Sequence, residues 1–235
     1  MNILAVGCHP DDIEIACAGT LAKYAREGNN VTVCHVANGD KGHVLIMPEE
    51  LKKIRTAEAE CAAALIGAKE VVNIDVGDLD VNMHNQDTVE KMIDLIRRVK
   101  PDVILTHSPV DYMNDHVQVS KLVFDASFSA SVPHKFTEHE AYPDIVPIYY
   151  MDTLAGVNFL PEDYVDISET IELKLEALAC HESQIKWMLE HDKIDFIDFV
   201  RTCSKFRGLQ CGTKYAEAFT KCVAWPRVIP RRMLP

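Results

Sequence analysis

The chain has 235 residues, of which 48% are hydrophobic and 26% are charged. This composition is typical of a globular protein with a sizeable core, and it argues against a disordered chain. The formal net charge of −12 disfavours nucleic acid and anionic membranes as partners, and the apolar runs are too short to span a bilayer.

Short apolar strands alternate with amphipathic helices along the first part of the chain. Residues 2–8 are typical of a buried parallel strand, and the helical stripe that follows them ends at Gly28. Pro48 favours the first turn of a helix, whereas Pro101 stops one. The predicted elements are strands at 2–8, 30–37, 70–75 and 102–107, and helices at 12–27, 48–66, 87–99 and 116–129.

The last part of the chain is less regular. We expect an irregular segment at 130–146 and an extended tail at 223–235. Strands are predicted at 147–151 and 163–167, and helices at 168–189 and 194–206. The alternating order predicts one α/β domain over 1–235, a Rossmann-like, doubly wound and mostly parallel sheet with helices on both faces.

The cysteines and the first residues indicate a cytoplasmic protein. The eight cysteines include no Cys-x-x-Cys pair, and most fall in predicted strands and helices, as reduced core thiols do. Residues 1–6 lack the basic region of a signal peptide.

Two strand ends of the predicted sheet carry histidines and aspartates. His9-Pro10-Asp11-Asp12 follows the first strand, whereas His107 and Asp115-His116 follow the fourth. Ligands of open α/β sheets bind outside the carboxyl ends of the strands, so these side chains can meet in one crevice. Two histidines and one carboxylate that leave a position open for water are typical of a catalytic zinc site, and a second aspartate can take a proton from that water.

Taken alone, His9-Pro10-Asp11-Asp12 has a simpler interpretation, a strand-to-helix turn in which an aspartate caps the helix. Further segments along nearly the whole chain favour the metal site. In chain order, these are Gly7-Cys8-His9-Pro10-Asp11-Asp12-Ile13-Glu14, Gly19-Thr20-Leu21-Ala22, Asn38-Gly39-Asp40-Lys41-Gly42, Arg55, Glu58, Gly77-Asp78, Thr106-His107, Asp111-Tyr112, Asp115-His116, Lys174, His181-Glu182-Ser183-Gln184 and Tyr215-Ala216-Glu217-Ala218-Phe219.

This ordered set resembles the PIG-L/LmbE family of zinc-dependent N-acetylglucosaminyl deacetylases. The resemblance implies that His9, Asp12 and His116 bind the metal and that Asp11 is the general base. It places Asp115 beside them as a catalytic partner. The substrate-binding set that we expect is Arg55, Asp78, Tyr112 and His107.

The resemblance also implies the cofactor and the partners. The cofactor is expected to be Zn²⁺, with Fe²⁺ or another divalent metal as the alternative, because sites of nitrogen and oxygen donors accept several metals. The expected partner is a small amino-sugar substrate, and relatives of this size often form homo-oligomers.

The chain departs from the family pattern at Met113, where relatives commonly have a histidine that helps to stabilise the oxyanion. Methionine cannot donate a hydrogen bond, and the loss of one such donor costs about 10²–10³ in rate if nothing replaces it. Three hypotheses follow: removal of acetyl from an N-acetylglucosamine-type sugar, hydrolysis of another amide such as a thiol–sugar conjugate, and an inactive metal-binding scaffold.

Other residues keep alternative interpretations. His107 is either a neighbour of the metal ligands or a hydrogen-bonded residue at a strand end. His181 is expected to pack inside the protein. Without the family pattern, Arg55 reads as a helix surface residue paired with Glu58.

Overall fold

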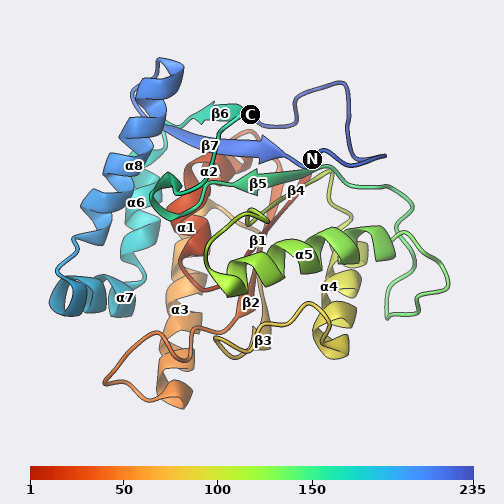
Figure 1. The fold of residues 1–235 in the computed structure, drawn as a ribbon, viewed down its shortest axis with the longest axis horizontal. Helices are drawn as coiled ribbons and strands as arrows, with labels where there is room; N and C mark the ends of the chain where they lie inside the picture. The colour runs from red at the N-terminus through yellow and green to blue at the C-terminus, as the bar shows by residue number, and fades with distance from the viewer.

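A computed structural model describes residues 1–235 and contains one seven-stranded sheet (Figure 1). The strand order is β3-β2-β1-β4-β5-β7-β6. The strands are β1 (Asn2–Gly7), β2 (Asn30–Ala37), β3 (Glu70–Val76), β4 (Val103–Thr106), β5 (Ile148–Met151), β6 (Asp163–Asp166) and β7 (Ala216–Lys221). The predicted doubly wound, mostly parallel sheet is confirmed.

Successive side chains of the central strands point to opposite faces of the sheet, so the apolar core forms two layers, one on each face. In β1, Ile3 and Ala5 belong to one apolar cluster, whereas Leu4 and Val6 belong to the other. Successive side chains of a strand point to opposite faces, so a strand that is buried on both sides is apolar throughout. Strand β1, which is buried from Ile3 to Gly7, therefore lies inside the molecule with apolar layers on both faces.

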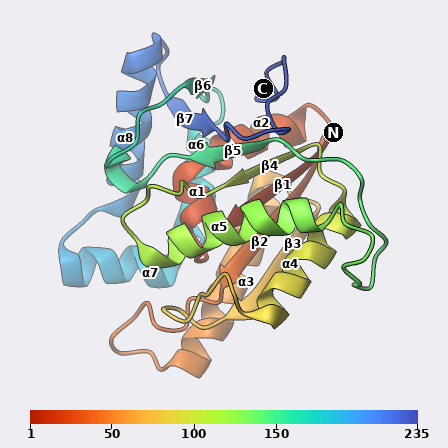
Figure 2. The ribbon, with the colours of Figure 1, turned by 45° about the vertical axis from the view of Figure 1, so that its right-hand side comes forward.

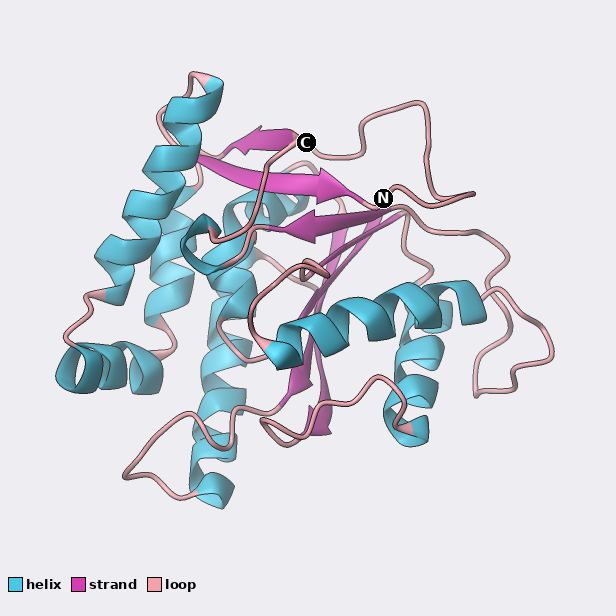
Figure 3. Cartoon of the chain, viewed as in Figure 1, coloured by secondary structure: helices cyan, strands magenta, loops and turns pink.

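Helices cover both faces (Figures 2 and 3). One face packs against α4 (Gln86–Val99) and α5 (Asn114–Ser129), which lie side by side (Figure 2). The other face packs against α1 (Asp12–Ala16), α2 (Ala18–Arg26), α3 (Pro48–Ile66), α6 (Ile171–Ala179) and α8 (Phe196–Cys211). Helix α7 (Glu182–Trp187) and a π-helical turn, Met188–Asp192, connect α6 to α8. None of the helices combines the length and the hydropathy that crossing a membrane requires.

Two helices that the sequence predicts as continuous are interrupted, because a distant carboxylate caps each second half. The expected helix 12–27 breaks at Cys17, and Glu217 accepts hydrogen bonds from the backbone N–H groups of Gly19 (2.9 Å) and Thr20 (2.7 Å). The expected helix 168–189 breaks after Ala179, where Glu58 accepts from Ser183 N (2.7 Å). Both acids bind N–H groups that the first turn of a helix leaves unpaired.

Strand β7 was not predicted. It runs antiparallel between β5 and β6, with Tyr150 opposite Thr220 and Val165 opposite Glu217. Its short stretch of mixed residues gives no strong strand pattern, and pairing on both edges stabilises it.

Lys174 and Glu217 form an ion pair inside the protein that joins α6, β7 and α1. Lys174 Nζ lies 2.6 Å from Glu217 Oε1 and 2.8 Å from the carbonyl oxygen of Ile15, and both side chains are almost fully buried. The pair fixes the last turn of α1, which is the helix that begins at Asp12.

Lys174→Met should lower the free energy of unfolding by about 3–5 kcal/mol, because it leaves a buried carboxylate without its counter-ion. Urea denaturation of the two proteins measures the difference. Lys186→Met is the control, since it removes only the exposed pair with Glu182 and should cost less than about 0.5 kcal/mol. Equal losses in the two variants would contradict the structural role of Lys174.

Candidate active site

The carboxyl ends of β1 and β4 meet in one polar pocket of about 320 Å³. The two strands pair in parallel, with Val6 opposite Thr106, so the residues that follow them emerge side by side. Cys8 N–H donates to His107 Nε2 at 2.9 Å and joins the two strand ends directly. The chain reverses its winding direction at this pair, which is where open α/β sheets bind ligands.

His9 and His116 lie on either side of Asp12. His9 Nδ1 is 3.5 Å from Asp12 Oδ2, and His116 Nε2 is 3.4 Å from Asp12 Oδ1. Ligands placed about 2.0–2.1 Å from one tetrahedral zinc ion would themselves be about 3.4 Å apart. Each separation, taken by itself, is that expected of two ligands of one small divalent cation.

Each of these imidazoles is held through its other ring nitrogen by a carboxylate. His9 Nε2 is 3.4 Å from Asp115 Oδ2, and His116 Nδ1 is 3.0 Å from Asp111 Oδ2. Metal-binding histidines usually have such a partner, which fixes the ring and its tautomer. His116 Nε2 is then left buried with no hydrogen-bond partner.

The site has an excess of negative charge that favours a cation. Burial lowers the pKa of His116, but Asp12 and the hydrogen bond to Asp111 outweigh it and raise that pKa to about 9. Burial likewise lowers the pKa of His9, while Asp115 and Asp12 raise it well above its usual value. The donor set, the unpaired Nε2 of His116 and this charge all fit a divalent metal ion.

When the potential ligand atoms are grouped by their mutual distances, the groups differ from the set His9, Asp12 and His116 expected from the sequence. Asp12 lies in two compact groups, one with Cys8 and His9 and the other with His107 and His116. His107 Nε2 already accepts the Cys8 N–H, so its lone pair is occupied. Burial raises the pKa of Cys8 to about 12, so without a metal ion it stays a thiol. Asp12 is common to both groups, and neither group contains His9 and His116 together.

Asp11 lies next to these donors in a strained backbone conformation. Its φ of 116° is rare for a residue with a side chain, and such strain costs about 1–3 kcal/mol where the surroundings impose it. Asp11 Oδ2 is 3.1 Å from Arg55 Nη2. Burial raises the pKa of Asp11 to about 6, and the guanidinium of Arg55 limits the rise. The carboxyl can therefore exchange a proton near neutral pH.

Arg55 is a buried residue of this pocket, so its interpretation as a surface partner of Glu58 is wrong. Only 3% of it is exposed, and it also donates to the carbonyl oxygens of Pro10 and Gly39. Gly39 has a φ of +77°, and a Cβ atom there would lie 2.6 Å from Arg55 Cδ, so the loop requires glycine to pack on the arginine. Glu58 instead binds Ser183.

The other predicted substrate residues occupy different positions. Asp78 is buried and accepts the backbone N–H groups of Gly39 (2.9 Å) and Lys41 (3.1 Å), so it shapes the loop beside Arg55. His107 lines the pocket, as does Met113. Tyr112 is exposed and does not belong to the pocket lining.

His181 is fully buried, as expected, with its Nε2 3.2 Å from Glu14 Oε2. Sequence reasoning missed Asp111 as the partner of His116, as well as Lys41, Asp152 and Gln184 in the wall of the pocket. Asp111 could have been found from its position five residues before His116, across the turn that starts α5.

Comparison with known proteins agrees with this geometry. Residues 4–127 match the family model for PIG-L, GlcNAc-PI de-N-acetylase. A diacetylchitobiose deacetylase from Thermococcus kodakarensis is 27% identical over 92% of this chain and 81% of its own length. A 4-oxalmesaconate hydratase from Pseudomonas putida is 26% identical over 78% of this chain and 74% of its own length.

The solved structure of N,N'-diacetylchitobiose deacetylase from Pyrococcus horikoshii superimposes with a TM-score of 0.81 at 25% identity. The superposition covers 94% of this chain and 83% of the other. The family model alone spans more than half of the chain and includes both strand ends that build the site. The chain belongs to the PIG-L family of de-N-acetylases.

Proposed function

We propose that this protein is a metal-dependent N-deacetylase that hydrolyses the acetamide of an N-acetylglucosamine-type sugar. The observation that carries the proposal is that the imidazoles of His9 and His116 both lie next to Asp12. Beside them, Asp11 forms an ion pair with the buried guanidinium of Arg55. The deacetylases among the relatives support this substrate class. A cytoplasmic location and a homo-oligomeric state stay predictions.

In this proposal His9, Asp12 and His116 hold one Zn²⁺ ion, or Fe²⁺ in its place. Such an ion polarises the amide carbonyl and lowers the pKa of the attacking water. Asp115 and Asp111 keep the two imidazoles in the tautomer that turns the free nitrogen toward Asp12.

Asp11 acts as the general base and then as the general acid. It takes a proton from water as the oxygen attacks the acyl carbon, and it returns that proton to the leaving nitrogen. The C–N bond breaks, and acetate and a free amino sugar are formed. Arg55 keeps Asp11 ionised before the attack and fixes its orientation.

Recognition of the sugar falls to the polar wall of the pocket. Arg55 and the loop that Asp78 shapes lie on this wall, with Lys41 and Gln184 beside them. Tyr112 is exposed and lies outside the pocket lining, whereas His107 lines the pocket and accepts the Cys8 N–H. Met113 offers no hydrogen bond to the oxyanion.

The hydratase among the relatives defines a second candidate function, which Met113 also favours because that residue departs from the deacetylase pattern. A metal-loaded wild-type protein that releases no acetate from any N-acetyl sugar, but hydrates an unsaturated oxo-tricarboxylate, would replace the deacetylase proposal with a hydratase.

Asp11→Asn should lower kcat for acetate release by about 10²–10⁴, since the amide cannot take a proton from water. Bound metal should stay at the wild-type level because Asp11 is not among the proposed ligands. An enzymatic acetate assay and elemental analysis measure both quantities. Asp87→Asn, an exposed change, is the control, and unchanged turnover in Asp11→Asn would reject its role.

His116→Ala and His9→Ala should each reduce the zinc that survives dialysis from about one ion per chain to a small fraction of that, since each removes one of three donors. Elemental analysis gives the ratio, and His84→Ala, at an exposed position, is the control. Full zinc occupancy in either variant would show that the ligand set is different.

Arg55→Gln should move the acidic limb of the kcat/KM profile to higher pH by about 1–3 units. The base works only when ionised, so activity falls as the pH drops through its pKa, and removal of the cation raises that pKa. A profile from pH 4 to 9 tests this, with Lys52→Gln on the same helix as the control because it pairs only with exposed Asp75. An acidic limb that stays at the wild-type pH in Arg55→Gln would show that Arg55 does not lower the pKa of the catalytic base.

A further inference from the structure

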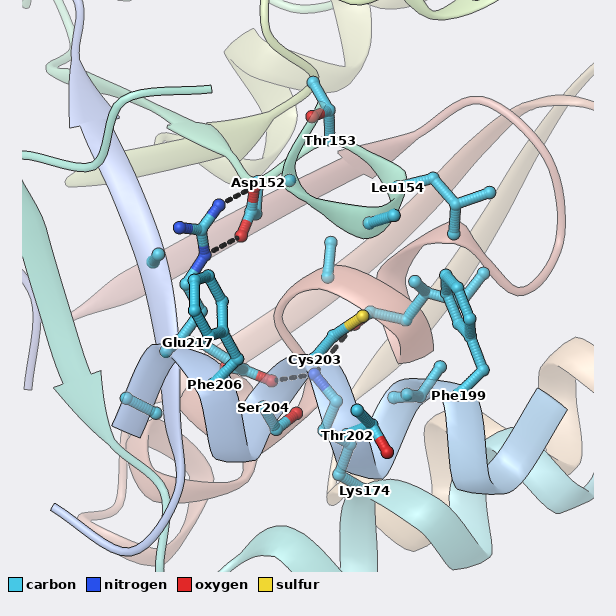
Figure 4. A pocket seen from close by; sticks show the side chains of 18 residues that line it. Asp152, Thr153, Leu154, Lys174, Phe199, Thr202, Cys203, Ser204, Phe206 and Glu217 are labelled. Carbon is cyan, nitrogen blue, oxygen red and sulfur yellow. Dashed lines mark hydrogen bonds and ion pairs between the residues drawn. The ribbon is translucent and has the colours of Figure 1, made fainter. Parts of the chain in front are cut away.

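A second cavity of about 280 Å³ adjoins the polar pocket (Figure 4). It lies between the segment after β5, helices α6 and α8, and strand β7. The two pockets share Ile15, Ala16, Asp152 and Leu154 as wall residues. They therefore meet at the end of α1, the helix that begins at Asp12.

The charged groups in the wall of this cavity are already paired with one another. Arg207 donates from Nε and Nη2 to the two carboxylate oxygens of Asp152, at 2.6 and 2.9 Å. Lys174 donates to Glu217, whose carboxylate also binds the start of α2. A charged ligand would have to break one of these pairs, so the cavity favours a neutral group.

The rest of the wall is mainly apolar. Ile15, Leu154 and Phe199 face the cavity, together with Ala16, Val200, Phe206, Ala216 and Ala218. The cavity has roughly twice the volume of the ~150 Å³ apolar cavity that binds benzene in another protein. It therefore has room for several methylene groups.

The polar pocket itself has two chemically different sides. Its hydrogen-bonding groups, Lys41, Arg55, Asp78 and Gln184, do not line the second cavity. The residues shared with the second cavity are apolar except for Asp152, which is bound to Arg207. A sugar whose hydroxyl groups face the polar side would turn its amide substituent toward the shared apolar wall.

We propose that the second cavity holds the acyl chain of the substrate, and that the enzyme prefers N-acyl amino sugars with acyl groups longer than acetyl. This inference rests on the proposed amide hydrolysis. Water supplies OH to the acyl carbon and H to the nitrogen as the C–N bond breaks, so the products are the longer carboxylic acid and the free amino sugar.

The first experiment compares N-acetyl-, N-butanoyl- and N-hexanoyl-glucosamine on the metal-loaded wild-type enzyme. Burial of each added methylene should raise kcat/KM by up to about fourfold, so butanoyl, with two more methylenes, should exceed acetyl by up to about 16-fold. Release of the free amine is measured for each substrate. Equal or slower hydrolysis of the longer chains, with acetyl hydrolysed normally, overturns the inference and leaves the proposed function intact.

Variants that fill the second cavity test whether the preference for longer acyl chains arises there. Cys203 on α8 lines the second cavity and not the polar pocket, and Figure 4 shows its sulfur among the lining side chains. Cys203→Phe should lower the ratio of hexanoyl to acetyl turnover by about tenfold or more. Cys203→Leu is the milder alternative if Cys203→Phe does not fold.

The matched control is Lys205→Phe, which adds the same ring to an exposed position of α8 that does not line the cavity. It should keep the wild-type ratio. An unchanged ratio in folded Cys203 variants, or an equal loss in the control, overturns the assignment. If kcat/KM rises for octyl N-acetylglucosaminide but not along the acyl series, the second cavity holds the aglycone and the inference about the acyl chain is wrong.

Binding without turnover separates this inference from the proposed function. Isothermal titration of Asp11→Asn with N-hexanoyl- and N-acetyl-glucosamine should give at least about tenfold tighter binding of the longer chain. The difference should disappear when Cys203→Phe is added. Equal affinities would overturn the inference even if the wild-type enzyme hydrolyses neither sugar.

Discussion

Strands β1 and β4 lie side by side although 100 residues separate Val6 from Thr106, and the site depends on that pairing. The pairing brings the turn after β1 next to the loop after β4, where the winding of the sheet reverses. The bond from Cys8 N–H to His107 locks the two ends together. A shift of this register by one residue would move the turn that carries His9 and Asp12 relative to the loop that carries Asp115 and His116, and would break the contacts between them.

Negative charge then organises the pocket. Asp12 lies between two imidazoles, and each imidazole is held from behind by a further carboxylate. Buried carboxylates this close together are tolerated only with positive charge among them. The guanidinium of Arg55 supplies one such charge on the side of Asp11, and the donors around Asp12 fit a second one, a divalent cation.

The parts of the protein that stabilise the site also shape what lies beside it. Lys174 and Glu217 fix the end of α1 and the start of α2, and they form part of the wall of the second cavity. Asp152 and Arg207 hold the segment after β5 against α8 on another side of that cavity. Because these charges are satisfied internally, the space between them remains apolar and adjoins the reactive pocket.

The sequence by itself determined the parts that depend on local pattern. Continuous apolar runs marked the buried parallel strands, helical stripes marked the helices, and His9-Pro10-Asp11-Asp12 and Asp115-His116 marked the residues at the strand ends. Tertiary structure decided the rest. It broke two helices where Glu217 and Glu58 arrive from distant segments, turned Arg55 inward to Asp11, placed Asp111 behind His116, and inserted β7 between β5 and β6. Each of these features is a contact between segments far apart in the chain or a choice of side-chain direction, and neither leaves a periodic trace in the residues nearby.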